Sequence, residues 1–295
     1  MYTIIGANGF LGSYLIRSIL ANTSDNIVAA ARGVEGLACD ERVRPLRCDV
    51  TSPGDVLELA EAMSGKEPCK VFYLAAYHNI DGVEQNPKAA WAVNITALAS
   101  FLGAIDPPAC LFFSSTDCVY GDGRIEHRFT EKDTLEPLGH YGSQKAAAEC
   151  LVTACGGHAL RLPYMFGPSL SPQKKHFYDK IIDDLKHGTS VRLFTDAVRS
   201  ALDYATVADM AVRLAEKAVC ERVPNVLNLC SDEALSKYDL GLRLAKKEAL
   251  PEKLILPVEM REDHEIFQAK RAGVCLMDNT LLKQTLGLRE LKMSM

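Results

Sequence analysis

Strand-like and helix-like segments alternate along the first half of the chain. Short apolar runs, typical of buried strands, occupy about residues 2–6, 26–32, 43–50, 70–76, 109–115 and 158–163. Stretches with helical spacing of apolar residues lie at about residues 10–22, 52–63, 87–105 and 142–154. A chain with this order folds into a parallel sheet with helices on both faces. We therefore predict an α/β fold built on a doubly wound parallel sheet.

The second half of the chain is less regular. Residues 164–176 form a loop rich in Pro and Gly, which is a suitable place for a lid or a substrate-binding insertion. Helices are expected at about residues 177–188, 207–219, 235–249 and 279–287, and a strand at about 225–231. We expect a dinucleotide-binding domain of residues 1–163 plus about 201–232. A smaller substrate-binding portion would comprise about residues 164–200 plus 233–295.

Composition and charge argue against several partners. The 295-residue chain has a net charge of −5 and no long basic run, so we expect no nucleic-acid partner. It has neither a signal-peptide pattern nor an apolar run of the ~18 residues that a transmembrane helix needs. We therefore expect a cytoplasmic protein without a membrane partner. The ten cysteines are scattered and form no CxxC, which predicts buried free thiols, with no disulfide framework and no metal site.

A glycine-rich turn follows the first strand and leads into the first helix. Its sequence, GANGFLG, spaces the glycines one residue wider in the first gap than the usual dinucleotide fingerprint. Glycines here permit a tight turn and a close approach of a pyrophosphate to the free N–H groups of the helix. The turn predicted to bind a cofactor comprises Gly6, Asn8, Gly9, Phe10, Leu11 and Gly12.

The residue at the end of the second strand favours one cofactor over another. An NAD site carries Asp or Glu there, because a carboxylate binds the ribose hydroxyls of the adenosine. This chain has Arg32, whose guanidinium suits a 2′-phosphate. We therefore predict NADP, with NAD as the alternative because Glu35 is close in sequence.

Tyr141 and Lys145 lie four residues apart, on one face of a predicted helix. A phenol with a pKa of ~10 is a poor acid–base catalyst at neutral pH. A nearby ammonium stabilises the phenolate and lowers that pKa. The pair therefore predicts proton transfer by Tyr141.

Together these features resemble the extended short-chain dehydrogenase/reductase family. The resemblance extends over most of the chain and includes GANGFLG, LAA, SSTDCVYG, YGSQK and LRLPYMFGP, together with Asn94. It implies a Rossmann sheet and three catalytic residues: Thr116, Tyr141 and Lys145. The further cofactor contacts that it implies are Asp49, Val50, Leu74, Ala75 and Ala76, with Lys145 at the nicotinamide ribose. For Asn94, a helix residue that bonds backbone groups is the structural alternative.

Within this family the chain looks most similar to the dTDP-4-dehydrorhamnose reductases. Asp81 and Glu84 follow the Ala–Ala pair as in those enzymes, and Tyr164 is aromatic where many epimerases carry Asn. The resemblance implies hydride transfer from NADPH to a small-molecule sugar, a nucleotide-linked 4-keto-6-deoxy sugar. The residues expected at the substrate are Tyr77, Asp81, Tyr164 and His176.

The chain departs from the family at two places that bear on the substrate and the reaction. Leu202 stands where epimerases and dehydratases carry an Arg that binds the substrate pyrophosphate, and Arg199 is displaced from it. Cys118 follows Asp117 where dehydratases carry Glu, which disfavours dehydration. Cys118 and His176 are similar to an epimerising pair in GDP-fucose synthases, but we favour a packed thiol and a surface histidine.

Two alternative functions use the same residues. A sugar-nucleotide epimerase would keep its cofactor and consume none. A non-catalytic NADP-binding regulatory subunit would have the fold without turnover, although the intact Thr–Tyr–Lys set argues against it. The helices that carry Asn94 and Tyr141 commonly form a dimer bundle in relatives, so we expect a homodimer.

Overall fold

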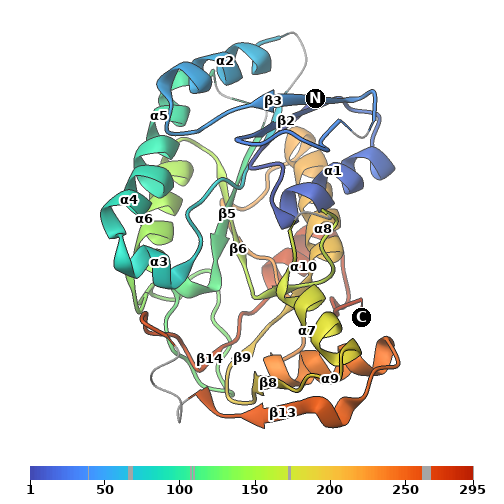
Figure 1. The fold of residues 1–295 in the computed structure, drawn as a ribbon. Coiled ribbons are helices and arrows are strands. Elements are labelled where there is room, and N and C mark those ends of the chain that lie inside the picture. Colours follow the sequence, from blue (N-terminus) through green and yellow to red (C-terminus); the bar gives the residue numbers. More distant parts are fainter. Residues whose placement is uncertain are drawn as a thin grey trace.

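A seven-stranded parallel sheet forms the centre of the molecule (Figure 1). The structure is a computed structural model that describes residues 1–38, 40–65, 69–106, 108, 110–171, 174–260 and 267–294. The strands of the sheet are β1 (Tyr2–Ile5), β2 (Ile27–Ala31), β3 (Val43–Arg47), β4 (Lys70–Tyr73), β5 (Cys110–Thr116), β6 (His158–Leu162) and β11 (Val226–Asn228). Their order is β11-β6-β5-β4-β1-β2-β3, which confirms the predicted doubly wound fold.

Helices cover both faces of this sheet (Figure 1). One layer contains α1 (Phe10–Asn22), α8 (Tyr204–Cys220) and α10 (Thr280–Leu286), which pack in one apolar cluster. The other contains α2 (Pro53–Met63), α5 (Ala97–Ala104) and α6 (His140–Ala154), which pack in a second cluster. The alternating pattern in the sequence therefore produces a three-layer core.

Strand β2 shows why the apolar runs in the sequence are continuous. Ile27 and Ala29 point into the cluster with α1, whereas Val28 and Ala30 point into the cluster with α2. Successive side chains of a strand face opposite sides, and here both sides are covered. All five residues of β2 are therefore buried.

The long helix predicted at residues 87–105 has an irregular centre. It consists of α4 (Pro87–Trp91), a π-helical turn η1 (Ala92–Thr96) and α5. The π turn contains Asn94, whose buried amide accepts from the Tyr77 N–H at 2.8 Å and donates to the Tyr77 carbonyl at 3.2 Å. Asn94 thus fixes the segment that follows β4, as its structural alternative predicts. A short helix, α3 (Ile80–Gln85), lies beyond that segment.

A smaller set of elements follows β6 (Figure 1). It contains β7 (Met165–Phe166), α7 (Phe177–Lys186), β8 (Val191–Phe194), β9 (Val198–Arg199), β10 (Leu202–Asp203), β12 (Leu235–Ser236), α9 (Lys237–Lys247), η3 (Glu252–Leu254), β13 (Ile255–Val258) and β14 (Val274–Cys275). Several of these elements, among them α7, β8, α9 and β13, share an apolar core around Ile181, Leu193 and Leu244. Strand β11 and α8 pack with the large sheet. The division into two portions stays a prediction.

Most of the cysteines lie as the sequence predicts. Nine are described and all carry free thiols, whereas Cys39 lies outside the described residues. Five of them are buried and Cys118 is half-buried, but the predicted burial is wrong for Cys150, Cys155 and Cys220, which are exposed because they lie in or directly after the solvent-facing parts of α6 and α8. In the described part of the chain, no group of side chains could hold a metal ion and no helix is long and apolar enough to span a membrane.

A buried ion pair joins α6 to strands β5 and β6. The Arg161 guanidinium donates to both Glu149 oxygens at 2.7–3.1 Å, and each side chain is at most 5% exposed. The Ser115 hydroxyl donates to the same carboxylate, and Arg161 also donates to the Tyr120 hydroxyl at 2.8 Å. Such a pair is sensitive to the loss of one partner, because the remaining charge stays buried.

We expect Arg161→Met to lower the free energy of unfolding by about 3–5 kcal/mol, because it leaves the Glu149 carboxylate unpaired. The double variant with Glu149→Gln should be less destabilised than Arg161→Met alone, because no buried charge remains. Urea denaturation measures both. Equal stabilities for Arg161→Met and wild type would contradict this interpretation of the pair.

Candidate active site

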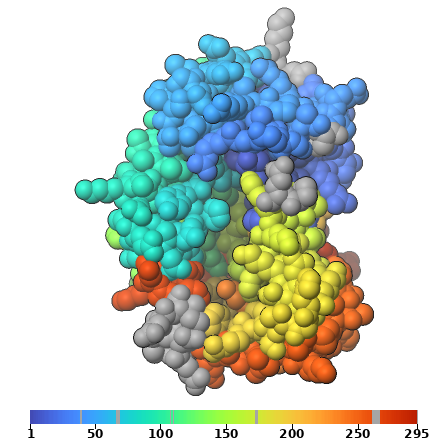
Figure 2. Space-filling view, in the orientation of Figure 1, coloured from blue at the N-terminus to red at the C-terminus, as the bar shows by residue number. Residues whose placement is uncertain are grey.

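A cavity of about 470 Å³ opens where the central strands end. Figure 2 shows a hollow bounded by the blue N-terminal segment, the teal segment with α3 and α4, and the yellow segment with α7. Its lining includes residues that directly follow β1, β4, β5 and β6. Ligands of open α/β sheets bind at this carboxyl edge.

The structure brings many of the predicted site residues together in this lining. Those that line the cavity are Gly6, Gly9, Phe10, Leu11, Gly12, Leu74, Ala76, Thr116, Tyr141, Lys145, Tyr164 and His176. Those outside it are Asn8, Arg32, Asp49, Val50, Ala75, Tyr77 and Asp81.

Two glycines in the turn after β1 cannot be replaced without movement of the backbone. Gly6 has a φ of +91°, and a Cβ there would lie 3.0 Å from the Ala75 nitrogen. A Cβ on Gly12 would lie 2.6 Å from the carbonyl oxygens of both Gly6 and Ala7. The first turn of α1 therefore packs directly on the glycine turn, with its N–H groups at the cavity.

Asn8 and Phe10 hold neighbouring loops against this turn. The Asn8 amide donates to the Gly33 carbonyl at 2.9 Å, and the Asn8 carbonyl accepts from the Lys174 ammonium at 2.7 Å. The ring of Phe10 lies edge-on to His176, 4.9 Å between centroids. The glycine turn is thus connected to the loops after β2 and β7.

The residues predicted at the adenosine end lie further along the same edge of the sheet. Arg32 directly follows β2 and is exposed. Asp49 follows β3, and hydrogen bonds from Thr51 hold the pKa of its carboxyl low, with Arg32 acting in the same direction. Val50 is partly buried and packs against the apolar cluster of α2, α5 and α6. The backbone of Ala75 lies next to Gly6.

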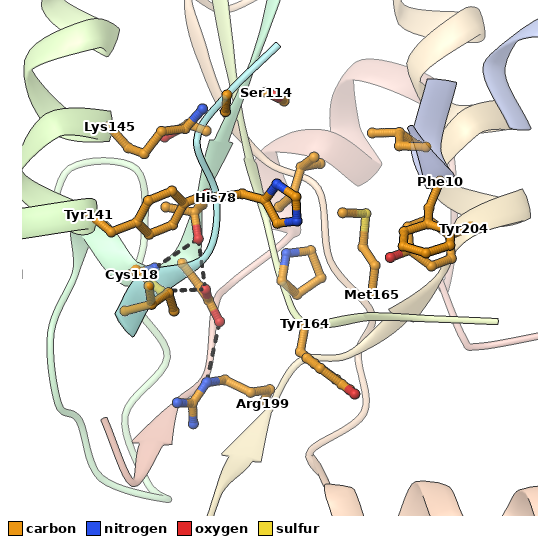
Figure 3. A pocket seen from close by; sticks show the side chains of 18 of the residues that line it. Phe10, His78, Ser114, Cys118, Tyr141, Lys145, Tyr164, Met165, Arg199 and Tyr204 are labelled. Atoms are coloured by element: carbon orange, nitrogen blue, oxygen red, sulfur yellow. Dashed lines mark hydrogen bonds and ion pairs between the residues drawn. The ribbon is translucent and has the colours of Figure 1, made fainter. Parts of the chain in front are cut away.

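One carboxylate organises the turn after β5 (Figure 3). Asp117 Oδ1 accepts from the Thr116 hydroxyl at 3.1 Å and from the Cys118 thiol at 3.5 Å. The Cys118 N–H donates to Thr116 Oγ1 at 3.2 Å. The other oxygen, Asp117 Oδ2, lies 3.3 Å from Arg199 Nε. Thr116 and Cys118 are therefore both oriented by Asp117.

Arg199 lines the cavity, but its donors are used within the protein. Its Nη1 donates to the carbonyls of Val198 and Gly273 at 2.8 Å, and its Nη2 donates to that of Ala272 at 2.6 Å. Together with the Asp117 contact, these bonds make it the anchor between β9 and the segment before β14. Arg199 therefore has no free pair of N–H groups with which to bind a substrate in a bidentate way.

Tyr141 and Lys145 lie on the same side of the cavity (Figure 3). Gly142 lies between them, and a Cβ there would be 2.3 Å from the Cys118 carbonyl oxygen. Helix α6 therefore packs directly on the turn that carries Thr116. This close packing puts the three predicted catalytic side chains on one wall.

Burial dominates the ionisation of these groups. It raises the pKa of Tyr141, and the Asp117 carboxylate acts in the same direction. This is opposite to the lowering expected from the sequence, because a buried phenolate is costly. Burial also lowers the pKa of Lys145 to about 7, although the negative charge of Glu149 acts in the opposite direction. Lys145 Nζ lies 4.0 Å from the centre of the Phe113 ring.

Cys118 is a protonated thiol. Burial raises its pKa to about 12, and the Asp117 carboxylate contributes to the shift. Its side chain lies beside Tyr141, across the cavity from Phe10 and Tyr204 (Figure 3).

His176 begins α7, as expected, but it is half-buried and lines the cavity instead of lying on the surface. Its Nδ1 accepts from the Tyr178 N–H at 3.3 Å, which leaves the proton of the neutral ring on Nε2, 3.1 Å from the Tyr204 hydroxyl. Burial lowers its pKa to about 4. Its contacts place it on the Phe10 and Tyr204 side, opposite Cys118.

Two residues predicted at the substrate have contacts elsewhere. The backbone N–H and carbonyl of Tyr77 both form hydrogen bonds with the Asn94 side chain. Asp81 accepts from the N–H groups of Gln268 and Ala269 at 3.1 and 3.0 Å, and from Arg271 Nη2 at 2.7 Å. Asp81 thus fixes the segment from residue 268 to 271 against α3.

Sequence reasoning missed part of the lining. The cavity residues not predicted include His78, Phe194, Lys237, Met260, Phe267 and Arg271. Lys237 follows Ser236, which caps α9, so the local pattern indicated only a helix start. His78 directly follows the predicted residue Tyr77, so its place in the chain could have indicated it. No local signal marks the other five residues, because they reach the cavity through the fold of the C-terminal part.

The neutral His176 predicts a pH-dependent stability. Its folded pKa of about 4 lies below the usual 6.5, so the unfolded chain binds more protons between these values. The contribution of the neutral His176 to the free energy of unfolding is complete above pH 6.5 and is lost as the pH falls to about 4. After a discount for partial exposure, it amounts to about 2–3 kcal/mol. His176→Asn keeps a capping side chain and should flatten this part of the profile.

Thermal or urea denaturation between pH 4 and 7 measures this effect. The exposed His187, at the other end of α7, provides the matched control His187→Asn. An unchanged pH profile in His176→Asn would show that this histidine is not the group concerned.

Comparisons with known proteins agree with this geometry. The family described as "RmlD substrate binding domain" matches residues 1–293. The probable low-salt glycan biosynthesis reductase Agl14 of Haloferax volcanii is 28% identical over 83% of this chain and 80% of its own. The dTDP-4-dehydrorhamnose reductase of Aggregatibacter actinomycetemcomitans is 23% identical over 97% of this chain and 93% of its own.

A solved structure has the same fold. The crystal structure of dTDP-4-dehydrorhamnose reductase from Bacillus anthracis in complex with NADP aligns with a TM-score of 0.77 and 18% identity. The alignment covers 98% of this chain and 94% of that one. These relatives are named reductases, which supports the predicted oxidoreductase class.

Proposed function

We propose, because the chain belongs to the RmlD substrate binding domain family, that it uses NADPH to reduce the ketone of a nucleotide-linked 4-keto-6-deoxy sugar. This membership confirms the family resemblance expected from the sequence. The observation that carries the proposal is one cavity lined by the glycine turn together with Thr116, Tyr141 and Lys145. An NAD(P)-dependent oxidoreductase needs both a cofactor cradle and a proton donor at the same place.

The glycine turn fits a dinucleotide. Side chains are excluded at Gly6 and Gly12, which leaves backbone N–H groups for a pyrophosphate. NADPH supplies the hydride when it is bound. Leu74 and Ala76 would border it, and Arg32, exposed at the end of β2, is suited to the 2′-phosphate that distinguishes NADPH from NADH.

Tyr141 is suited to be the proton donor. Its raised pKa means that the phenol holds its proton at neutral pH and can give it to the alkoxide that forms at the reduced ketone. Thr116 lies on the same wall and would bond the carbonyl oxygen by turning its hydroxyl from Asp117. Lys145, when protonated, would hold the ribose and stabilise the negative charge left on Tyr141.

The ionisation of Cys118 and His176 does not favour epimerisation. An epimerising pair must remove a proton from carbon with one member and return it with the other. The Cys118 thiol holds its proton, and both ring nitrogens of His176 are engaged by Tyr178 and Tyr204. We therefore assign them no proton transfer, and we keep His176 as a predicted substrate contact because it lines the cavity.

A panel of nucleotide-linked 4-keto-6-deoxy sugars tests the function directly. Stoichiometric oxidation of NADPH with any of them supports the reductase. Interconversion of sugars with retained cofactor and no NADPH oxidation would instead identify an epimerase. Cofactor binding without turnover across the panel would favour the regulatory subunit.

The homodimer and the cytoplasmic location stay predictions. Trp91 ends α4 and is 49% exposed beside His140 and Ser143 of α6, so this face is open to a second copy of the chain.

We expect Tyr141→Phe to lower kcat by at least about a hundredfold while NADPH still binds, because the proton donor is lost and the fold is kept. NADPH absorbance measures turnover, and quenching of protein fluorescence measures binding. Tyr238→Phe on α9, outside the cavity lining, is the matched control. Near-normal turnover in Tyr141→Phe would overturn the proposed mechanism.

We expect Arg32→Ala to raise the Kd of NADPH by about tenfold or more and to leave that of NADH nearly unchanged, because only NADPH carries the 2′-phosphate. Titration calorimetry with both cofactors measures the two constants. Arg44→Ala, on the exposed side of β3, removes the same charge elsewhere as a control. Equal effects on NADPH and NADH would rule out recognition of the 2′-phosphate by Arg32.

A further inference from the structure

His78 is a cavity residue to which the proposed reaction gives no role. It lies in the segment between β4 and α3 and belongs to the lining of the cavity. Figure 3 shows its ring projecting from this segment into the cavity. Neither the cofactor cradle nor the transfer of a proton by Tyr141 uses it.

The imidazole of His78 has no partner within the protein. Among the residues that the structure describes, none forms a hydrogen bond or an ion pair with the ring, and no aromatic ring packs on it. The side chain is exposed to the cavity. A neutral imidazole has one N–H donor and one acceptor nitrogen, so both are free to bond a ligand.

The backbone on both sides of His78 is fixed. The N–H and the carbonyl of Tyr77 are bonded by the Asn94 amide. The Asn79 side chain caps α3 by accepting from the Gly82 N–H at 2.8 Å. The Tyr77 ring packs on this helix, because a Cβ on Gly82 would lie 2.8 Å from the Tyr77 hydroxyl. His78 is therefore presented to the cavity by a fixed segment, as a specific contact requires.

Other polar side chains of the lining already have partners. The Asp117 carboxylate pairs with Arg199, and both ring nitrogens of His176 are engaged. Of the two histidines in the lining, His78 is thus the one that is available to a ligand. Ligand cavities commonly fix the orientation of their ligand through a few such placed polar groups.

We propose that His78 hydrogen-bonds a ring hydroxyl of the sugar and thereby determines which sugars are accepted. The choice of ligand rests on the proposed function, because a 4-keto-6-deoxy sugar carries hydroxyls at C2 and C3 while its ketone faces Tyr141 in the same cavity. A hydroxyl both donates and accepts, as a neutral imidazole does. A site that bonds a hydroxyl rejects analogues that lack it. His78 is a specificity-determining residue and transfers no proton.

Binding to the enzyme saturated with NADP tests this contact without turnover. Calorimetry compares a dTDP-linked or UDP-linked 6-deoxyhexose with dTDP or UDP alone. His78→Ala should raise the Kd of the nucleotide sugar about five- to tenfold, because a hydrogen bond is lost, and should leave the Kd of the free nucleotide unchanged. His78→Gln keeps a donor and an acceptor and should restore most of the affinity. NADPH affinity and melting temperature should stay at wild-type values in both variants.

Two controls make the test specific. His187→Ala removes an imidazole from an exposed position at the end of α7, outside the cavity lining, and should change none of these affinities. Sugar analogues without the C2 or the C3 hydroxyl identify the bonded group, because one of them should bind wild type and His78→Ala equally.

The contact is refuted if His78→Ala binds the nucleotide sugars as wild type does, or if it weakens free nucleotide or NADPH to the same extent. A loss of equal size with both deoxy analogues would refute it as well, and so would a wild type that binds none of the nucleotide sugars.

Turnover separates this inference from the proposed function. If wild type binds nucleotide sugars through His78 but oxidises NADPH with no keto-sugar of the panel, the reductase proposal fails and the His78 contact stands. If wild type reduces such a sugar and His78→Ala has the same KM, the reductase stands and the contact fails. A raised KM with little change in kcat is the expected result.

Discussion

The Glu149 carboxylate is the contact on which the arrangement of the three predicted catalytic residues depends. It receives Ser115 from β5 and Arg161 from β6, and it belongs to α6, the helix that carries Tyr141 and Lys145. Two strands and a helix therefore meet at one buried charge. Because Thr116 directly follows Ser115, the bond from Ser115 to Glu149 also fixes the position of the Thr116 hydroxyl relative to Tyr141. The absence of a side chain at Gly142 lets the same helix pack directly on the turn after β5.

Charge is distributed unevenly over the cavity. The carboxylates Asp81 and Asp117 each form an ion pair with an arginine. Lys145 and Lys237 instead lie over aromatic rings. Burial lowers the pKa of both lysines, so each gains from an anion that restores its charge. For Lys145, the negative charge in the proposed mechanism is the phenolate that forms on Tyr141 during turnover.

The sequence predicts the elements whose patterns are long and repeated, and it fails where local rules conflict with packing. Helix α1 and the buried run of β2 follow from periodicity, and GANGFLG and YGSQK each contribute residues to the cavity lining. The π turn around Asn94 is not predictable, because it serves a contact with Tyr77 outside the helix. The direction of the Tyr141 pKa shift depends on burial, and Lys237 and Arg271 become neighbours only through the C-terminal fold.

The turn after β5 also determines how the site withstands oxidants. Peroxides and alkylating reagents attack thiolates, and the raised pKa of Cys118, about 12, keeps its thiol protonated at pH 7. Burial keeps the Cys118 sulfur protonated, and the Asp117 carboxylate that orients Thr116 adds to this effect. A cysteine can therefore lie beside Tyr141 as a thiol of low reactivity toward these reagents.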